Sequence, residues 1–287
     1  MKEMKNNSIV ESTSVLKHAL SRIMQVRDIP LAITRLMFIK YALDNYIGAD
    51  NVEKMQTYAQ AQKMLAMRDT GNMSSLITVL ECIDVAYGFD LILSEPGSIV
   101  QYEAALFHEN HINQKRNVTD EMFKDVMDAL GRIDLQEPDK DIHKVGEEVA
   151  EYLLAEINRE NKAALVRKSG FTITGQGVNT IAKGLLKVSS TDTFCDFTAG
   201  LGISTIGITK DVKPKVIIAD VERSYLAIAT MLLIMYGYKE INAVAGNTLE
   251  EIVEGVHGNK IFVDPPLMNK IRREGENRRI EASQAVV

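Results

Sequence analysis

The pattern of the sequence changes near residue 160, and this change constrains the fold more than any other feature. Before it, apolar residues recur at helical spacing with almost no runs of β-branched residues. Beyond Gly170, short apolar segments alternate with helical stretches. Such alternation predicts a parallel sheet with helices on both faces. We therefore expect two domains, a helical one over residues 1–160 and an α/β one over residues 161–287.

Breaks in the apolar pattern delimit the expected elements. Pro30 stands where a second helix would begin, because the first helical turn tolerates proline. The remaining N-terminal helices are expected at about 51–67, 74–87, 98–110, 119–131 and 143–161. Expected strands are 193–197, 215–220, 241–245 and 260–264, with helices at about 177–188, 202–209, 223–236 and 248–255.

Charge and composition limit the classes of function. The net charge is −6, whereas a protein that grips DNA alone usually carries a basic excess. Either the chain does not bind nucleic acid, or a partner subunit supplies most of the contact. Cys82 and Cys195 lie far apart and outside any metal-binding pattern, so they are expected to be buried thiols, and we expect no metal site. With no long apolar stretch and no signal peptide, a cytoplasmic protein is expected.

A glycine-rich turn follows the first expected strand, in the sequence DFTAGLGIST at residues 196–205. Gly200 and Gly202 stand where the strand would turn into a helix, and glycine there permits a tight backbone and close approach of a ligand. The second strand ends in Asp220, where doubly wound folds place an acid that binds ribose hydroxyls. Glu222 is a rival, although it is also suited to opening the next helix. A simple strand-to-helix turn remains an alternative.

Two classes of nucleotide-like cofactor fit this turn. One class is a dinucleotide, bound by a dehydrogenase, and the other is S-adenosylmethionine (SAM), whose adenosine part is bound by a methyltransferase. A dinucleotide fingerprint needs a third small residue at position 205, where Thr205 stands. Thr205 favours the methyltransferase without excluding a dehydrogenase.

The fourth expected strand ends in DPPL at residues 264–267. Proline cannot continue a strand ladder, so two prolines predict a rigid turn at the carboxyl edge of the sheet, where ligands bind. An acid before them can accept hydrogen bonds from an exocyclic amine, as on a base extruded from DNA. A plain chain reversal is the alternative, but the order of glycine turn, acid and DPPL favours an amine-directed site.

These motifs resemble those of amino-methyltransferases with a DPPY or NPPY motif, and more closely the modification subunits of type I restriction systems. The helical region resembles theirs at Leu36-Met37-Phe38-Ile39-Lys40 and from Gly146 through Tyr152-Leu153-Leu154. The α/β region resembles theirs at Gly170-Phe171-Thr172-Ile173-Thr174, at Asp196, Gly200, Gly202 and Asp220, at residues 229–237 (ATMLLIMYG) and at Gly246-Asn247-Thr248-Leu249. The resemblance thus spans nearly the whole chain in the correct order.

The resemblance implies a SAM-dependent adenine-N6 DNA methyltransferase with a Rossmann-like doubly wound sheet. Its helical domain would face partners or DNA, and DNA would be recognised through a specificity subunit of a complex that also holds a restriction subunit. Self-association is also open. The catalytic positions would be Asp264, Pro265, Pro266 and Leu267. The cofactor-binding positions would be Phe171, Thr172, Ile173, Thr174, Asp196, Thr198, Gly200, Gly202, Asp220, Val221, Asn247 and Thr248.

The sequence also departs from the family pattern. Gly175 replaces a proline, Asn247 replaces an acid expected at the adenine ring of SAM, and Leu267 replaces an aromatic that stacks on the flipped base. The family fold has three more strands, so the second domain is expected to be incomplete at its C-terminus. Residues 270–287 are expected to form a charged loop and a helix start, with solvent or phosphates as partners of the basic side chains. A weakened binding or assembly module, and a methyltransferase for RNA or protein amines, remain alternatives.

Overall fold

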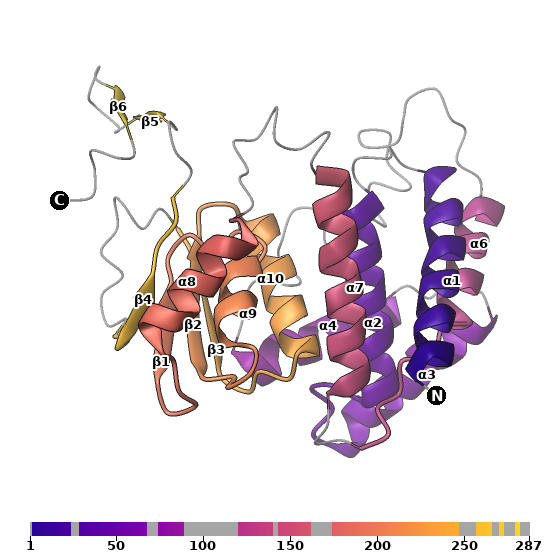
Figure 1. Cartoon of the computed structure of the whole chain (residues 1–287). Helices are drawn as coiled ribbons and strands as arrows, with labels where there is room; N and C mark the ends of the chain where they lie inside the picture. Colours follow the sequence, from indigo (N-terminus) through magenta and orange to yellow (C-terminus); the bar gives the residue numbers. More distant parts are fainter. Residues whose placement is uncertain are drawn as a thin grey trace. The chain divides into compact units, whose positions relative to one another are not determined.

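The structure is a computed structural model that describes residues 2–23, 29–67, 74–88, 120–139, 143–161, 174–246, 257–265, 270–272 and 279–281. The chain divides into two compact units. The first contains Met1–Ile157 and Met231–Gly237, and the second contains Asn158–Thr230 and Tyr238–Val287. Helices make up the described part of the first unit, and the second unit contains the parallel sheet (Figure 1).

Most described helices of the first unit lie close to their predicted positions, but the first begins well before Ser14, where the helical spacing of apolar residues starts in the sequence. The helices are α1 (Lys2–Ser21), α2 (Ile29–Asn45), α3 (Val52–Met67), α4 (Ser74–Tyr87), α6 (Asp120–Gly131) and α7 (Lys144–Asn161). The central helix is α2, which contacts α1, α3, α4 and α6. Because it packs on several sides, its Met37, Phe38 and Tyr41 are fully buried. Pro30 lies in its first turn as predicted, whereas the predicted helix at 98–110 lies outside the described residues.

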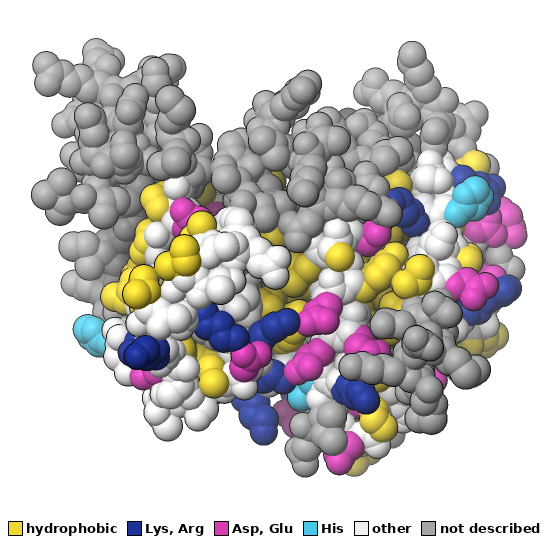
Figure 2. Space-filling view, viewed as in Figure 1, with side chains coloured by type: hydrophobic (Ala, Val, Ile, Leu, Met, Phe, Trp, Pro, Cys, Tyr) yellow, Lys and Arg dark blue, Asp and Glu magenta, His cyan; other side chains and the backbone are white. Residues whose placement is uncertain are grey.

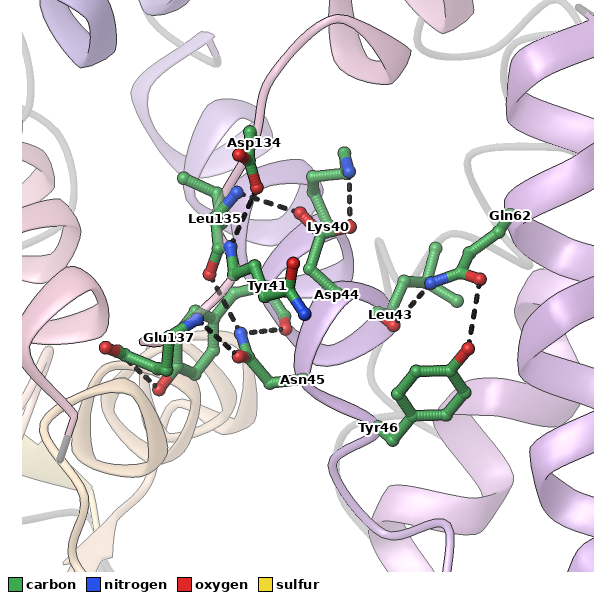
Figure 3. Close-up of polar contacts among 11 residues, drawn as sticks. Lys40, Tyr41, Leu43, Asp44, Asn45, Tyr46, Gln62, Asp134, Leu135 and Glu137 are labelled. Carbon is green, nitrogen blue, oxygen red and sulfur yellow. Dashed lines mark hydrogen bonds and ion pairs between the residues drawn. The ribbon is translucent and has the colours of Figure 1, made fainter. Parts of the chain in front are cut away.

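Side chains at the end of α2 fix the segment that links α6 to α7 (Figure 3). The Asn45 Nδ2 donates to the Leu135 carbonyl (2.9 Å), and its Oδ1 accepts the Glu137 N–H (2.8 Å). The Asp44 carboxylate accepts the Leu135 N–H (2.8 Å) and pairs with Lys40. Backbone groups of this segment, which is neither helix nor strand, therefore form their hydrogen bonds with side chains.

Glu137 then caps α7. Its carboxylate accepts the N–H groups of Val145 (2.9 Å) and Gly146 (2.7 Å), two donors that have no partner inside a helix. The Tyr41 hydroxyl also donates to Glu137 (3.1 Å). Burial, followed by the charge of Glu137, raises the pKa of Tyr41 far above its usual value, so the hydroxyl stays protonated and remains a donor.

The second unit contains a four-stranded parallel sheet in the order β3-β2-β1-β4. The strands are β1 (Thr193–Asp196), β2 (Lys215–Asp220), β3 (Ile241–Ala245) and β4 (Lys260–Phe262). The helices are α8 (Gln176–Leu186), α9 (Ile203–Thr209) and α10 (Arg223–Met235), of which α10 belongs to this unit up to Thr230. The α/β architecture with a helical N-terminal region and a parallel sheet is confirmed. The predicted helix at 248–255 lies outside the described residues.

The fourth strand is shorter than predicted. It ends at Phe262, and the Asp264 N–H donates to the Thr198 hydroxyl (2.9 Å) instead of to a neighbouring strand. Pro265 follows and has no N–H to offer. The DPPL sequence therefore ends the strand early.

Buried strands and one apolar helix form the described core of the second unit. Phe194, Val216 and Ile218 are fully buried on β1 and β2, and α10 is buried along most of its length. Cys195 is buried on β1, and Cys82 is buried in the first unit, as predicted for both. Among the helices that the structure describes, none combines the length and the apolar character needed to cross a membrane.

Helix α8 leaves an apolar stripe exposed. Val178, Ile181 and Leu185 are 46%, 65% and 78% exposed, at a spacing that places them on one side of the helix. Figure 2 shows yellow side chains along this helix. The opposite side of α8 is anchored by buried Asn179 and Ala182, so the helix has one packed and one open side.

The prediction of a charged loop and helix start for residues 270–287 is wrong for the residues that the structure describes there. Lys270–Arg272 (β5) and Arg279–Glu281 (β6) form a two-stranded antiparallel sheet. Each strand has one isoleucine between two charged residues, and Ile271 pairs with Ile280. Alternation of charged and apolar residues along three positions suits an extended strand, in which successive residues belong to opposite faces, better than a helix.

Gly202 supplies the first testable prediction. Its φ is +75°, and an added Cβ would lie 3.0 Å from the Ala229 Cβ. We expect Gly202→Ala to lower the free energy of unfolding by about 2–4 kcal/mol, from left-handed strain and overpacking together. Gly184→Ala is the control, because nothing lies within 4 Å of its added Cβ, and it should stabilise α8 by about 1 kcal/mol. Urea unfolding tests both, and a Gly202→Ala variant as stable as wild type would contradict the strain.

Candidate functional site

Three carboxylates follow three neighbouring strands. Asp196 ends β1, Asp220 ends β2, and Asp264 lies two residues beyond β4. Because these strands are parallel and β1 lies between the other two, all three residues lie at the carboxyl edge of the sheet. The structure thus brings together acids that are up to 68 positions apart in the sequence.

The glycine turn is tied to the end of β2. The Gly200 N–H donates to Oδ2 of Asp220 (2.7 Å), and the Ala199 N–H donates to the Ala219 carbonyl (3.0 Å). Gly200 has a φ of +51° and Gly202 one of +75°, a conformation that disfavours other residues. These bonds hold the backbone of the turn close to Asp220. Gly200 is half-buried, whereas Gly202 is buried and its missing side chain makes room for Ala229 of α10.

Asp220 holds two backbone groups at once. Its Oδ2 accepts from Gly200, and its Oδ1 accepts the Glu222 N–H (2.9 Å). The side chain is half-buried, and burial raises its pKa, while these hydrogen bonds act in the opposite direction. An ionised carboxylate has about four lone-pair positions, so lone pairs remain for further donors such as the hydroxyls of a ribose. The rival acid, Glu222, is exposed and lies directly before α10.

Asp196 is the most deeply buried of the three acids. Its Oδ2 accepts from the Thr205 hydroxyl (2.7 Å), and its Oδ1 accepts the Thr198 N–H (3.2 Å). Burial raises its pKa to about 6, and the charges of Asp220 and Asp264 also raise it. The site therefore concentrates negative charge, and a cation placed there would lower the cost of ionising Asp196.

Thr205 is the contact that the sequence analysis missed. In the sequence, Thr205 stands out only as a departure from the dinucleotide pattern, yet its hydroxyl is the donor to Asp196. A buried acid at a strand end requires a donor, and the first turn of the following helix can supply one. A hydroxyl residue in that turn was therefore a usable signal.

Asp264 is linked to two parts of the chain. Its N–H donates to the Thr198 hydroxyl, and its Oδ2 accepts from the Thr174 hydroxyl (2.7 Å). Thr174 lies directly before Gly175, the N-cap residue of α8. Of the other predicted positions, Val221 is exposed beside Asp220, and Pro265 follows Asp264. Phe171, Thr172, Ile173, Asn247, Thr248, Pro266 and Leu267 lie outside the described residues.

Two solved structures share the fold of this chain. A methyltransferase subunit of a type I restriction-modification system from Streptococcus thermophilus matches with a TM-score of 0.60 at 13% identity, over 92% of this chain and 64% of that chain. A protein from Vibrio vulnificus YJ016, described as a modification subunit of a type I restriction enzyme, matches with a TM-score of 0.59 at 10% identity, over 93% and 62%. The fold is that of type I methyltransferase subunits.

The likeness is one of fold. Both matches include the helical region and the sheet, since each covers more than nine tenths of this chain. The chain spans less than two thirds of either matched protein. No protein-family model matches the sequence, and no curated protein matches it either.

The buried acid gives a prediction for pH dependence. Because the folded-state pKa of Asp196 lies above its ordinary value of 3.8, folding favours the protonated form. Its contribution to stability is complete below about pH 4 and is lost as the pH rises through about 6. A shift of this size corresponds to about 3 kcal/mol. The unfolding free energy of Asp196→Asn, relative to wild type, should therefore rise by about 3 kcal/mol between pH 4 and pH 7.

Urea unfolding at several pH values measures this difference. Asp211→Asn is a control of opposite sign, because the hydrogen bond from Lys183 lowers the pKa of Asp211. Parallel pH profiles for wild type and Asp196→Asn would show that Asp196 carries no raised pKa.

Proposed function

We propose that this chain is the modification subunit of a type I restriction-modification system, which transfers a methyl group from SAM to adenine N6 in DNA. The main support is the carboxyl edge of the sheet, where a left-handed glycine turn, the half-buried Asp220 and the exposed Asp264 lie together. Resemblance of the fold to type I methyltransferase subunits adds to this support.

The residues at this edge suit SAM. When bound, SAM supplies a methyl group on a positively charged sulfur, and it also carries an ammonium group. Three neighbouring carboxylates favour such a cationic ligand over a neutral one. Asp220 would accept from the ribose hydroxyls, and the backbone near Gly200 and Gly202 would lie against the methionine part. Phe171 to Thr174, Thr198, Val221, Asn247 and Thr248 complete the proposed SAM site.

The amine-binding part of the site would be formed by the DPPL residues. The Asp264 carboxylate and the Pro265 carbonyl would accept the two hydrogens of the adenine N6 amine and orient its nitrogen toward the methyl group. Pro266 and Leu267 would shape the space for the base. Catalysis would come from positioning and hydrogen bonding, without a covalent intermediate on the protein.

Sequence recognition would be supplied by partners. The net charge of −6 is unfavourable for tight binding to phosphates. We propose a separate specificity subunit that brings the chain to DNA and a restriction subunit in the same complex. Self-association also fits this proposal.

The replacement at Leu267 supports a second candidate function, that of a binding or assembly module with weakened catalysis. Leucine offers apolar contact but lacks the flat face on which a base stacks. A methyl-transfer assay separates the candidates, with labelled SAM and DNA, RNA or protein as acceptor, in the presence and absence of a specificity subunit. Label incorporated into DNA adenine supports the main proposal. Incorporation only into RNA or protein, or none although SAM binds, would overturn it.

The net negative charge of the chain predicts how it binds DNA. We expect the chain alone to bind DNA weakly and without sequence preference, with an affinity that falls steeply as salt increases. Electrophoretic or anisotropy titrations from about 50 to 200 mM salt measure this. Sequence-specific binding by the isolated chain at physiological salt, with a dissociation constant near the roughly 10⁻⁸ M typical of specific complexes, would be inconsistent with the proposal.

A further inference from the structure

Asp264 is exposed but held at two points. Pro265 restricts its backbone to extended conformations, and the Thr198 hydroxyl accepts its N–H. Its remaining freedom lies in the side-chain torsions, which on an exposed carboxylate would sample several rotamers. The hydroxyl of Thr174, 2.7 Å from Oδ2, removes this freedom. A hydroxyl that donates to a charged carboxylate makes one of the stronger hydrogen bonds in proteins.

Thr174 is itself placed by rigid elements. The carbonyl of the next residue, Gly175, accepts N–H groups from Val178 (2.9 Å) and Asn179 (3.3 Å) in the first turn of α8. Asn179 is buried, and its amide packs against Gly207 of α9. The position of Thr174 is therefore fixed by the start of α8 and by the packing of that helix.

Thr198 connects the backbone of Asp264 to the buried Asp196. Its N–H donates to Asp196, and its hydroxyl accepts from the Asp264 N–H. The end of β4 is thus bound to the end of β1 through one residue. The backbone of Asp264 is fixed by Thr198, and its Oδ2 is engaged by Thr174. Neither threonine hydroxyl binds the other carboxylate oxygen, Oδ1, in the described contacts.

We propose that Thr174 is a positioning residue for methyl transfer. It holds the Asp264 carboxylate in the one rotamer in which Oδ1 accepts a hydrogen bond from the substrate amine. This inference rests on the proposed role of Asp264 as the amine acceptor. It assigns to Thr174 a function in turnover that is separate from contact with the cofactor.

Three variants test the role. Thr174→Val keeps the shape and removes the hydroxyl, whereas Thr174→Ser keeps the hydroxyl. Thr180→Val makes the same chemical change on the exposed face of α8, where the Thr180 hydroxyl donates only to the Gln176 carbonyl (2.9 Å) in the described contacts. We expect Thr174→Val to lower kcat at least about tenfold, the scale expected for a misplaced catalytic group. The kcat of Thr174→Ser and Thr180→Val should stay within about twofold of wild type. All rates are compared at saturating SAM, so that a change in cofactor affinity at Thr174 does not enter kcat, and Thr180→Val should retain the wild-type dissociation constant for SAM.

A second readout does not depend on turnover. Three-bond NMR couplings across the Cα–Cβ bond of Asp264 should indicate one rotamer in wild type and Thr174→Ser, and averaging in Thr174→Val. Averaging already present in wild type, or couplings unchanged by Thr174→Val, would overturn the positioning role. So would a wild-type kcat in Thr174→Val when Asp264→Ala is inactive. Turnover unaffected by Asp264→Ala would instead refute the role of Asp264 in the proposed function.

Discussion

Replacement of Asp220 by alanine is expected to weaken SAM binding by about 1–3 kcal/mol, which is about 5- to 150-fold in the dissociation constant. The variant loses the acceptor for the ribose. It also releases the Gly200 and Glu222 N–H groups, so the glycine turn is no longer tied to the end of β2. Both effects act on the part of the site that is proposed to bind SAM.

Two comparisons make this test specific. Glu222→Ala changes a neighbouring exposed acid and should leave SAM affinity unchanged, because Asp220 rather than Glu222 holds the turn. Asp220→Asn keeps one side-chain acceptor, so its SAM affinity should lie between that of Asp220→Ala and that of wild type. Thermal unfolding of each variant monitors the fold. A folded Asp220→Ala variant that binds SAM as well as wild type would show that the ribose role is wrong.

The DPPL residues, which are proposed to hold the target base, should affect methylation without affecting SAM binding. Leu267→Tyr is expected to raise the rate of adenine methylation by about 5- to 150-fold, because stacking on an aromatic contributes about 1–3 kcal/mol per base. SAM affinity should stay within about twofold of wild type, since Leu267 is not among the residues proposed to contact SAM. For the wild-type chain assayed without a specificity subunit we expect measurable SAM binding with little methylation.

Methyl-transfer assays on DNA with many adenine sites measure the effect, and Leu267→Met is the matched control without a ring. Equal rates for the tyrosine and methionine variants would contradict a stacking role. Robust turnover by the wild-type chain would show that no aromatic is needed at this position.

Local patterns were sufficient to predict most elements of the fold. Lys215–Asp220 and Ile241–Ala245 match the predicted strands because each is a short apolar run between polar turns. The short pair formed by Lys270–Arg272 and Arg279–Glu281 was missed. Strands of three residues give too few alternations for a period to be recognised in the sequence.

The position of the three acids could be predicted from the sequence, because each follows an expected strand. Asp196, Asp220 and Asp264 meet because parallel strands place their carboxyl ends at one edge. The hydroxyl contacts were not predictable in the same way. The bond from Thr174 to Asp264 joins residues 90 positions apart, and it depends on where α8 begins. No local pattern specifies such a distance.

Calorimetric titration of the wild-type chain with SAM tests the central proposal most directly. We expect saturable binding of one SAM per chain, stronger at pH 7 than at pH 5, because a cationic ligand favours the ionised form of Asp196. The Asp220→Ala variant should show the weaker binding described above, with the same stoichiometry. Absence of binding by the folded wild-type chain at millimolar SAM, or binding that Asp220→Ala leaves unchanged, would contradict the assignment of this edge of the sheet as a SAM site.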